Sequence, residues 1–113
     1  MERTTPNVAD AGIWGRLTGE GRSAAVIRFI LPDRTISFPY HALTRWEYAV
    51  GETETLLVFA GTNTITVRGR HLGPLRDGLD RARLEQVRVQ GERAALRATP
   101  NEPWIQAITV RNS

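Results

Sequence analysis

The residues of this chain best suited to chemistry lie in one short segment, from Arg68 to Pro74. It places Arg68, Arg70 and His71 beside two glycines, where alternating apolar residues give way to helical spacing. Backbone N–H groups at the start of a helix attract anions, and neighbouring cations add to that attraction. The segment therefore predicts an anion site at a helix N-terminus. The alternative is that the glycines only relieve a tight turn, because their spacing matches neither the dinucleotide fingerprint nor the phosphate loop, which also needs a lysine.

Arginine usage is the second feature that bears on function. All 15 basic residues are arginine, and the formal net charge is +3. Guanidinium groups form paired hydrogen bonds with phosphate or carboxylate, which ammonium groups do not, so one interpretation is a surface adapted to acidic partners. The other interpretation is a coding bias toward arginine, and the even spread of the arginines along the chain favours it. Either way the protein is weakly basic rather than polycationic.

A nucleic-acid-binding sheet is the main alternative function that these arginines allow. Arg45 stands next to Trp46 and close to Tyr48, in the pattern of a sheet that stacks bases against aromatic and arginine side chains. Val50 continues the stripe of the two aromatic residues, however, and this favours a stripe that faces the core. The possible contacts to an anion or a nucleic acid are Arg45, Arg68, Arg70, His71 and Arg88.

No catalytic or metal-binding motif stands out in the sequence. The chain has no cysteine, which excludes thiolate zinc sites, thiol nucleophiles and disulfides. His41 and His71 lack the spacing of a metal-binding pair, and no Gly-x-Ser-x-Gly motif occurs. The carboxylates Glu47, Glu52 and Glu54 are expected to keep a strand end soluble. We therefore expect a protein that is not an enzyme and that uses no metal or cofactor.

Alternating apolar residues predict the strands that position these groups. Turn signals rich in glycine, proline and aspartate separate the runs, as expected for hairpins. A short strand is also expected around Ile13 to Leu17. The main predicted strands are residues 24–31, 35–40, 45–50, 56–60, 64–68, 84–89 and 104–110.

One amphipathic helix is predicted over residues 72–83. Its apolar stripe has spacings of three, four and three residues, with charged residues on the opposite side. Pro74 suits the first helical turn, where its missing N–H has no helical partner to lose. Gly78 inside the helix indicates either close packing of the helix against the sheet or a neutral position. The stripe consists of Leu72, Leu75, Leu79 and Ala82.

Short turns between successive strands predict an antiparallel meander. The predicted fold is thus α+β, with the meander forming a bent sheet or small open barrel and the helix packed on it or capping it. Residues 12–113 are expected to form one domain, preceded by a mobile tail over residues 1–11. The N-terminal segment lacks the apolar core of a signal peptide, and no apolar run is long enough to cross a bilayer. We therefore expect a cytoplasmic protein without a membrane partner.

The C-terminal strand, residues 104–110, carries the prediction on partners. It is rich in strand-forming residues and almost uncharged, so its edge has to be covered. Pairing with a second copy would make a dimer, whereas pairing within its own sheet is the alternative. Together with the absence of catalytic motifs, this favours a binding or assembly module that acts through protein contacts. The expected interface residues are Trp104, Ile105, Ile108 and Val110.

Overall fold

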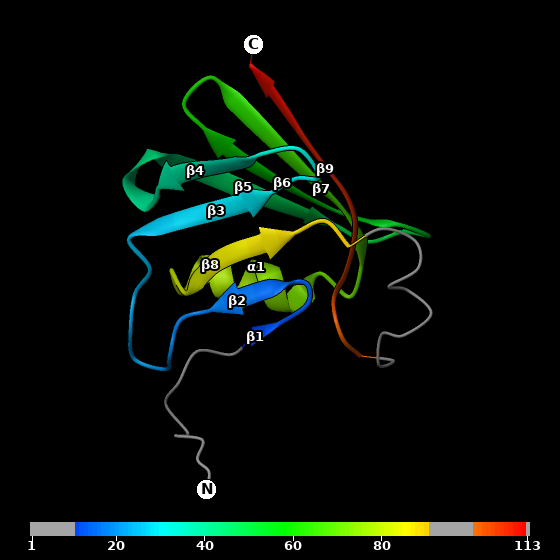
Figure 1. The fold of residues 1–113 in the computed structure, drawn as a ribbon, viewed down its shortest axis with the longest axis horizontal. Helices are drawn as coiled ribbons and strands as arrows, with labels where there is room; N and C mark the ends of the chain where they lie inside the picture. Colours follow the sequence, from blue (N-terminus) through cyan, green and yellow to red (C-terminus); the bar gives the residue numbers. More distant parts are fainter. Residues whose placement is uncertain (1–10, 91–100, 113) are drawn as a thin grey trace, which may run out of the picture.

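The computed structural model describes residues 11–90 and 101–112 of the chain. Within them the protein is α+β, with one α-helix and two sheets that are largely antiparallel (Figure 1). This confirms the predicted fold class, and the arrangement is a bent, open one rather than a closed barrel. The predicted mobile tail falls almost entirely on residues 1–10, outside the described residues.

The first sheet, sheet A, has five strands in the order β1-β2-β8-β3-β4. β3 and β4 form the predicted hairpin, with Phe29 facing Ile36 across it. The strands are β1 (Ala11–Gly12), β2 (Gly15–Leu17), β3 (Val26–Ile30), β4 (Thr35–Pro39) and β8 (Leu84–Arg88).

The second sheet, sheet B, has four strands in the order β5-β6-β7-β9, and all its neighbours are antiparallel. A short 3-10 helix, η1 (Tyr40–Ala42), leads from sheet A into it. The Tyr40 hydroxyl donates to the Leu84 carbonyl and so ties this connection to β8. The strands of sheet B are β5 (Leu43–Ala49), β6 (Glu54–Ala60), β7 (Asn63–Arg70) and β9 (Trp104–Asn112).

Helix α1 (Gly73–Asp80) is shorter than the predicted 72–83, and its C-terminus explains why. The N–H of Ala82 donates to the Leu79 carbonyl at 3.0 Å, and the N–H of Arg83 donates to the Gly78 carbonyl at 2.7 Å. This is the Schellman pattern, in which a residue in the left-handed region ends the helix. Ala82 holds that place with φ of 54°, so the apolar spacing continues past the point where the helix stops.

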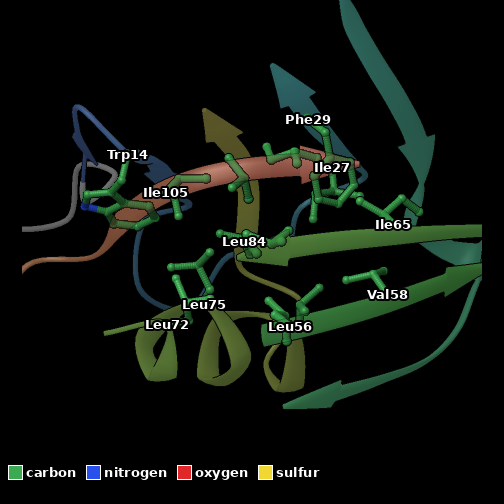
Figure 2. Close-up of a cluster of buried hydrophobic side chains, with 14 of the residues drawn as sticks. Trp14, Ile27, Phe29, Leu56, Val58, Ile65, Leu72, Leu75, Leu84 and Ile105 are labelled. Carbon is green, nitrogen blue, oxygen red and sulfur yellow. The ribbon is translucent and has the colours of Figure 1, made fainter. Parts of the chain in front are cut away.

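The core lies between the two sheets and is closed by α1 (Figure 2). The stripe residues Leu72, Leu75 and Leu79 are all buried against it, as predicted. Gly78 marks the close packing of the helix, because a Cβ there would lie 2.6 Å from the Leu17 side chain and 3.1 Å from Leu84 Cβ. Other buried residues include Ile27, Phe29, Leu56, Val58, Ile65, Val67, Leu84, Val87 and Ile105.

Two features of the topology correct the meander prediction. β8 pairs with β3 in parallel, because the chain returns through α1 before it enters sheet A again. Such a crossover is the usual way to make parallel neighbours, and local turn signals do not report it. β9 then crosses back to β7, with Ile105 opposite Gly69. The sheets also meet where the N–H of Gln90 donates to the Ile105 carbonyl at 2.9 Å.

Candidate functional site

The side of sheet B that faces away from the core presents residues of all four strands on one surface. On β6 and β7 the alternate residues Leu56, Val58, Ile65 and Val67 are fully buried, so their neighbours point outward. Strand register then groups these neighbours with the matching positions of β5 and β9. We call this surface the outer face of sheet B; it consists of Arg45, Glu47, Ala49, Thr55, Leu57, Phe59, Thr64, Thr66, Arg68, Arg70, Trp104, Ala107, Thr109 and Arg111.

Apolar residues and threonines fill the middle of this outer face, and arginines lie around them. Leu57 and Phe59 on β6 are both half-buried, and they face Thr66 and Thr64 on β7. Arg111 lies opposite Thr64, on the edge strand β9. The pattern of a sheltered apolar centre with polar and charged surroundings is typical of interaction surfaces.

Two arginines of this face lie over aromatic rings. The guanidinium carbon of Arg45 is 4.3 Å from the centroid of the Phe59 ring, and Arg45 also forms a 2.9 Å ion pair with Glu47. The guanidinium carbon of Arg70 is 5.6 Å from the centroid of the Trp104 ring. Such contacts hold a long side chain flat on the sheet and lower the entropy it loses when a partner binds.

The charge of the outer face is strongly one-sided. Arg68, Arg70 and Arg111 are all exposed, and none of them forms an ion pair with a carboxylate in residues 11–90 or 101–112. Glu47 is the one carboxylate on the face, and it is paired with Arg45. Within the described residues the surface therefore offers three guanidinium groups without an ion pair to an acidic partner.

The structure brings together three of the five residues predicted to contact anions or nucleic acid. Arg45, Arg68 and Arg70 share the outer face of sheet B. Arg88 lies elsewhere, on β8 of sheet A opposite Ile30. His71 follows β7 and lies at the start of α1.

Sequence reasoning missed Leu57, Phe59 and Arg111 as members of this surface. Both sides of β6 are apolar in the sequence, so alternation alone does not separate its exposed side from its buried side. Only the register, which places Phe59 opposite Thr64 and Thr64 opposite Arg111, assigns them to one exposed face.

The predicted anion site at the helix N-terminus already holds an internal anion. Oε2 of Glu54 accepts a hydrogen bond from the His71 N–H at 2.9 Å, and Oε1 accepts from the Leu72 N–H at 2.8 Å. The Tyr48 hydroxyl donates to the same Oε1 at 2.6 Å. Glu54 thus satisfies helix-terminal N–H groups that would otherwise lack a partner. An external anion would have to displace this carboxylate.

These hydrogen bonds shift the pKa values of Glu54 and Tyr48 in opposite directions. Burial acts to raise the pKa of Glu54, but the hydrogen bonds from Tyr48, Leu72 and His71 outweigh it and hold the pKa below the ordinary value. The hydrogen bond to Glu54 is the main reason that the pKa of Tyr48 is raised. Both shifts describe a carboxylate that is stabilised in its ionised form.

The aromatic residues of β5 face the core, as the sequence favoured, whereas Val50, expected to continue their stripe, is 75% exposed just after the strand ends. Trp46 and Tyr48 lie opposite the buried residues Val58 and Leu56 and pack against the core cluster. The indole Nε1 of Trp46 donates to Oδ1 of Asp80 on α1 at 2.7 Å. These rings therefore anchor the helix, and they are not part of the outer face of sheet B.

The predicted interface residues of the C-terminal strand are mostly used within the molecule. β9 pairs with β7, and its side chains Ile105 and Ile108 are buried in the core with exposed fractions of 0% and 7%. Trp104 is 9% exposed within the molecule, so little of its ring is accessible to a second copy, and Val110 is half-buried. What β9 offers a second copy is the outer edge of its backbone, because β9 is the last strand of sheet B.

Neither a metal site in the described residues nor a match to a known protein adds to this description of the site. In residues 11–90 and 101–112 no three His, Cys, Asp or Glu side chains gather as a metal site would require. No helix in the same ranges has the length and apolar character needed to cross a membrane. Comparisons with protein-family models, curated proteins and solved structures give no match for this chain.

Proposed function

We propose that this chain is a non-enzymatic binding module that acts through protein contacts, and that the outer face of sheet B is its binding surface. One observation carries the proposal: Leu57 and Phe59 form a half-buried apolar centre beside three arginines that form no ion pair in the described part of the chain, Arg68, Arg70 and Arg111. Arginine and aromatic residues are enriched in protein interfaces and carry much of their energy.

The charge of this surface defines the partner further. Three exposed guanidinium groups around an apolar centre fit a protein segment that carries both apolar and acidic side chains. A second copy of the chain is another protein partner, through the outer edge of β9. The proposal includes a cytoplasmic location, where a domain without disulfides is ordinary.

Single-stranded nucleic acid is the second candidate partner, favoured by the grouping of Arg45, Arg68 and Arg70 on one face. Arginines and aromatic rings on a sheet can stack bases and neutralise phosphates. We rank it second, because Arg45 lies over Phe59 and Trp104 is only 9% exposed, so the aromatic rings of this face are not free for stacking.

Selection of short peptides from a random display library on the immobilised protein tests the proposal. We expect selected peptides to be acidic and apolar, and their affinity to fall by at least about tenfold in Arg68→Glu and in Leu57→Glu. Arg28→Glu is the matched control, because Arg28 is exposed on the outward side of sheet A and the change in charge is the same. Affinities are measured by fluorescence anisotropy.

Binding of an oligothymidylate distinguishes a protein partner from single-stranded nucleic acid. If the protein binds it with an affinity that falls steeply with salt and is lost in Arg68→Glu, nucleic acid replaces protein as the partner. If selected peptides bind Arg68→Glu and Leu57→Glu as tightly as the unmodified protein, the outer face of sheet B is not the binding surface.

A further inference from the structure

A second group of arginines lies away from the outer face of sheet B, around a depression of about 400 Å³. It is formed by the loop that follows β2 and the loop that follows α1. An adjoining depression of about 260 Å³ shares Arg81 and Arg83 and continues along α1 past Asp77. We call the larger one the arginine depression; it is lined by Glu20, Gly21, Arg22, Ser23, Arg81 and Arg83.

Backbone hydrogen bonds fix the two loops against each other. The Thr18 N–H donates to the Arg83 carbonyl at 2.7 Å, and the Ala24 N–H donates to the Ala82 carbonyl at 2.6 Å. These bonds lie on both sides of the segment that lines the depression, so its walls are tied at two points. A site fixed in this way loses little conformational entropy when a ligand binds.

The end of helix α1 places two arginines at this depression. Ala82 adopts a left-handed conformation with φ of 54°, which non-glycine residues seldom do. The reversal lies between Arg81 and Arg83, and both line the depression. Arg83 is oriented further, since its Nε and Nη2 both donate to the Thr18 carbonyl, at 3.2 and 2.6 Å.

The lining carries an excess of positive charge. Arg22 and Arg81 are exposed and form no ion pair within residues 11–90 and 101–112. Glu20 is the single carboxylate of the lining, and no ion pair joins it to these arginines. The lining thus holds three arginines and one glutamate around a space open to solutes, and Ser23 adds a hydroxyl group.

The C-terminus of helix α1 does not by itself explain why Arg22, Arg81 and Arg83 lie together. Cations at a helix C-terminus complement its dipole, which accounts for Arg81 and Arg83. Arg22 belongs to the other loop, far from α1 in sequence, and has no such role. Guanidinium groups that converge from two elements are suited to phosphate, which accepts bidentate hydrogen bonds from several arginines at once.

We propose that the arginine depression binds a compact phosphate-bearing small molecule. The phosphate oxygens accept hydrogen bonds from Arg22 and Arg81, while Arg83 supplies a fixed positive charge at the site. Glu20 disfavours each additional negative charge on the ligand. This inference is independent of the protein-binding surface, because no residue of the depression belongs to the outer face of sheet B.

Titration of the full chain with inorganic phosphate, followed by amide chemical shifts at constant ionic strength, tests the proposal. We expect saturable shifts confined to residues near 19–24 and 81–84. Arg22→Gln and Arg81→Gln should each weaken binding by at least about fivefold. Glu20→Gln should tighten it by about two- to fivefold, because it removes the one opposing charge.

Arg34→Gln is the control, since Arg34 is exposed in the turn after β3 and the change in net charge is identical. The proposal is overturned if Arg34→Gln weakens phosphate binding as much as Arg22→Gln, because the attraction is then a property of net charge. It is also overturned if the shifts do not saturate, or if they map to the outer face of sheet B.

Discussion

Replacement of Glu54 by glutamine is the sharpest test of how the end of β7 and the start of α1 are held together. In the structure the two carboxylate oxygens accept from two backbone N–H groups and from the Tyr48 hydroxyl, at 2.6 to 2.9 Å. Glutamine has one acceptor oxygen, so its amide N–H₂ would face either the His71 N–H or the other two donors. The variant thus loses the negative charge and at least one hydrogen bond.

The expected cost follows from these two losses. A hydrogen bond to a charged group contributes about 1.5–3 kcal/mol when sheltered, and less here because the His71 contact is exposed. The negative charge at a helix N-terminus contributes a further ~0.3–1 kcal/mol. We expect Glu54→Gln to lower the free energy of unfolding by about 1–2 kcal/mol, or the melting temperature by roughly 3–8 °C.

The assay is urea denaturation followed by tryptophan fluorescence at neutral pH and again at acidic pH. The folded-state pKa of Glu54 lies below that of an ordinary glutamate, so the contribution of its carboxylate to stability is complete above the ordinary value. It is lost as pH falls through the folded-state pKa, and the difference between the two proteins should shrink accordingly. Tyr48→Phe, alone and combined with Glu54→Gln, isolates the contribution of the hydroxyl.

Glu52→Gln is the matched control, because Glu52 is exposed in the preceding turn and makes the same change in charge. If Glu54→Gln costs no more than Glu52→Gln, the carboxylate does not stabilise the helix N-terminus. The same conclusion follows if the difference between Glu54→Gln and the unmodified protein persists unchanged in acid.

Three further predictions address packing and assembly. Leu75→Ala should cost about 2–5 kcal/mol in the same denaturation assay, because Leu75 is fully buried, whereas Leu57→Ala on the outer face of sheet B should cost clearly less. Gly69→Ala should lower the free energy of unfolding by more than about 2 kcal/mol, because a Cβ at Gly69 would overlap the Trp104 carbonyl oxygen of β9. Gly51→Ala is the control and should be tolerated, because a Cβ at Gly51 would lie 3.5 Å from its nearest neighbour, the Thr53 carbonyl oxygen. Equal stability of the two variants would contradict the pairing of β7 with β9. Sedimentation velocity over a range of concentrations should show self-association through the edge of β9, and a folded monomer at all micromolar concentrations would contradict it.

The local elements of this protein were accessible from the sequence because each has its own signal. Alternation over residues 64–68 and the leucine spacing from Leu72 to Leu79 predict β7 and α1, and both are present. The turn residues between successive strands likewise predict the β3–β4 hairpin and the β5–β6–β7 meander. These features depend on residues close in the chain, so periodicity and turn chemistry are sufficient.

The end of helix α1 and the role of Glu54 needed the tertiary structure. The apolar stripe continues to Ala82, and only the hydrogen bonds of the Schellman turn show where the helix stops. Glu54 lies 17 residues before His71, and nothing in the local pattern links the two. A carboxylate at a strand end has many possible partners, and the choice among them is made by packing.

Some properties of the candidate site follow from the sequence, and others follow only from the tertiary structure. The sequence by itself determined that the chain has arginine and no lysine, that it lacks cysteine, and that its strands alternate. Only the tertiary structure decided that Arg45, Arg68 and Arg111 share one face while Arg88 lies on another sheet. The reason is that strand order and register are set by the burial of long-range apolar contacts, and a change of one residue in register moves every side chain of a strand to the opposite face.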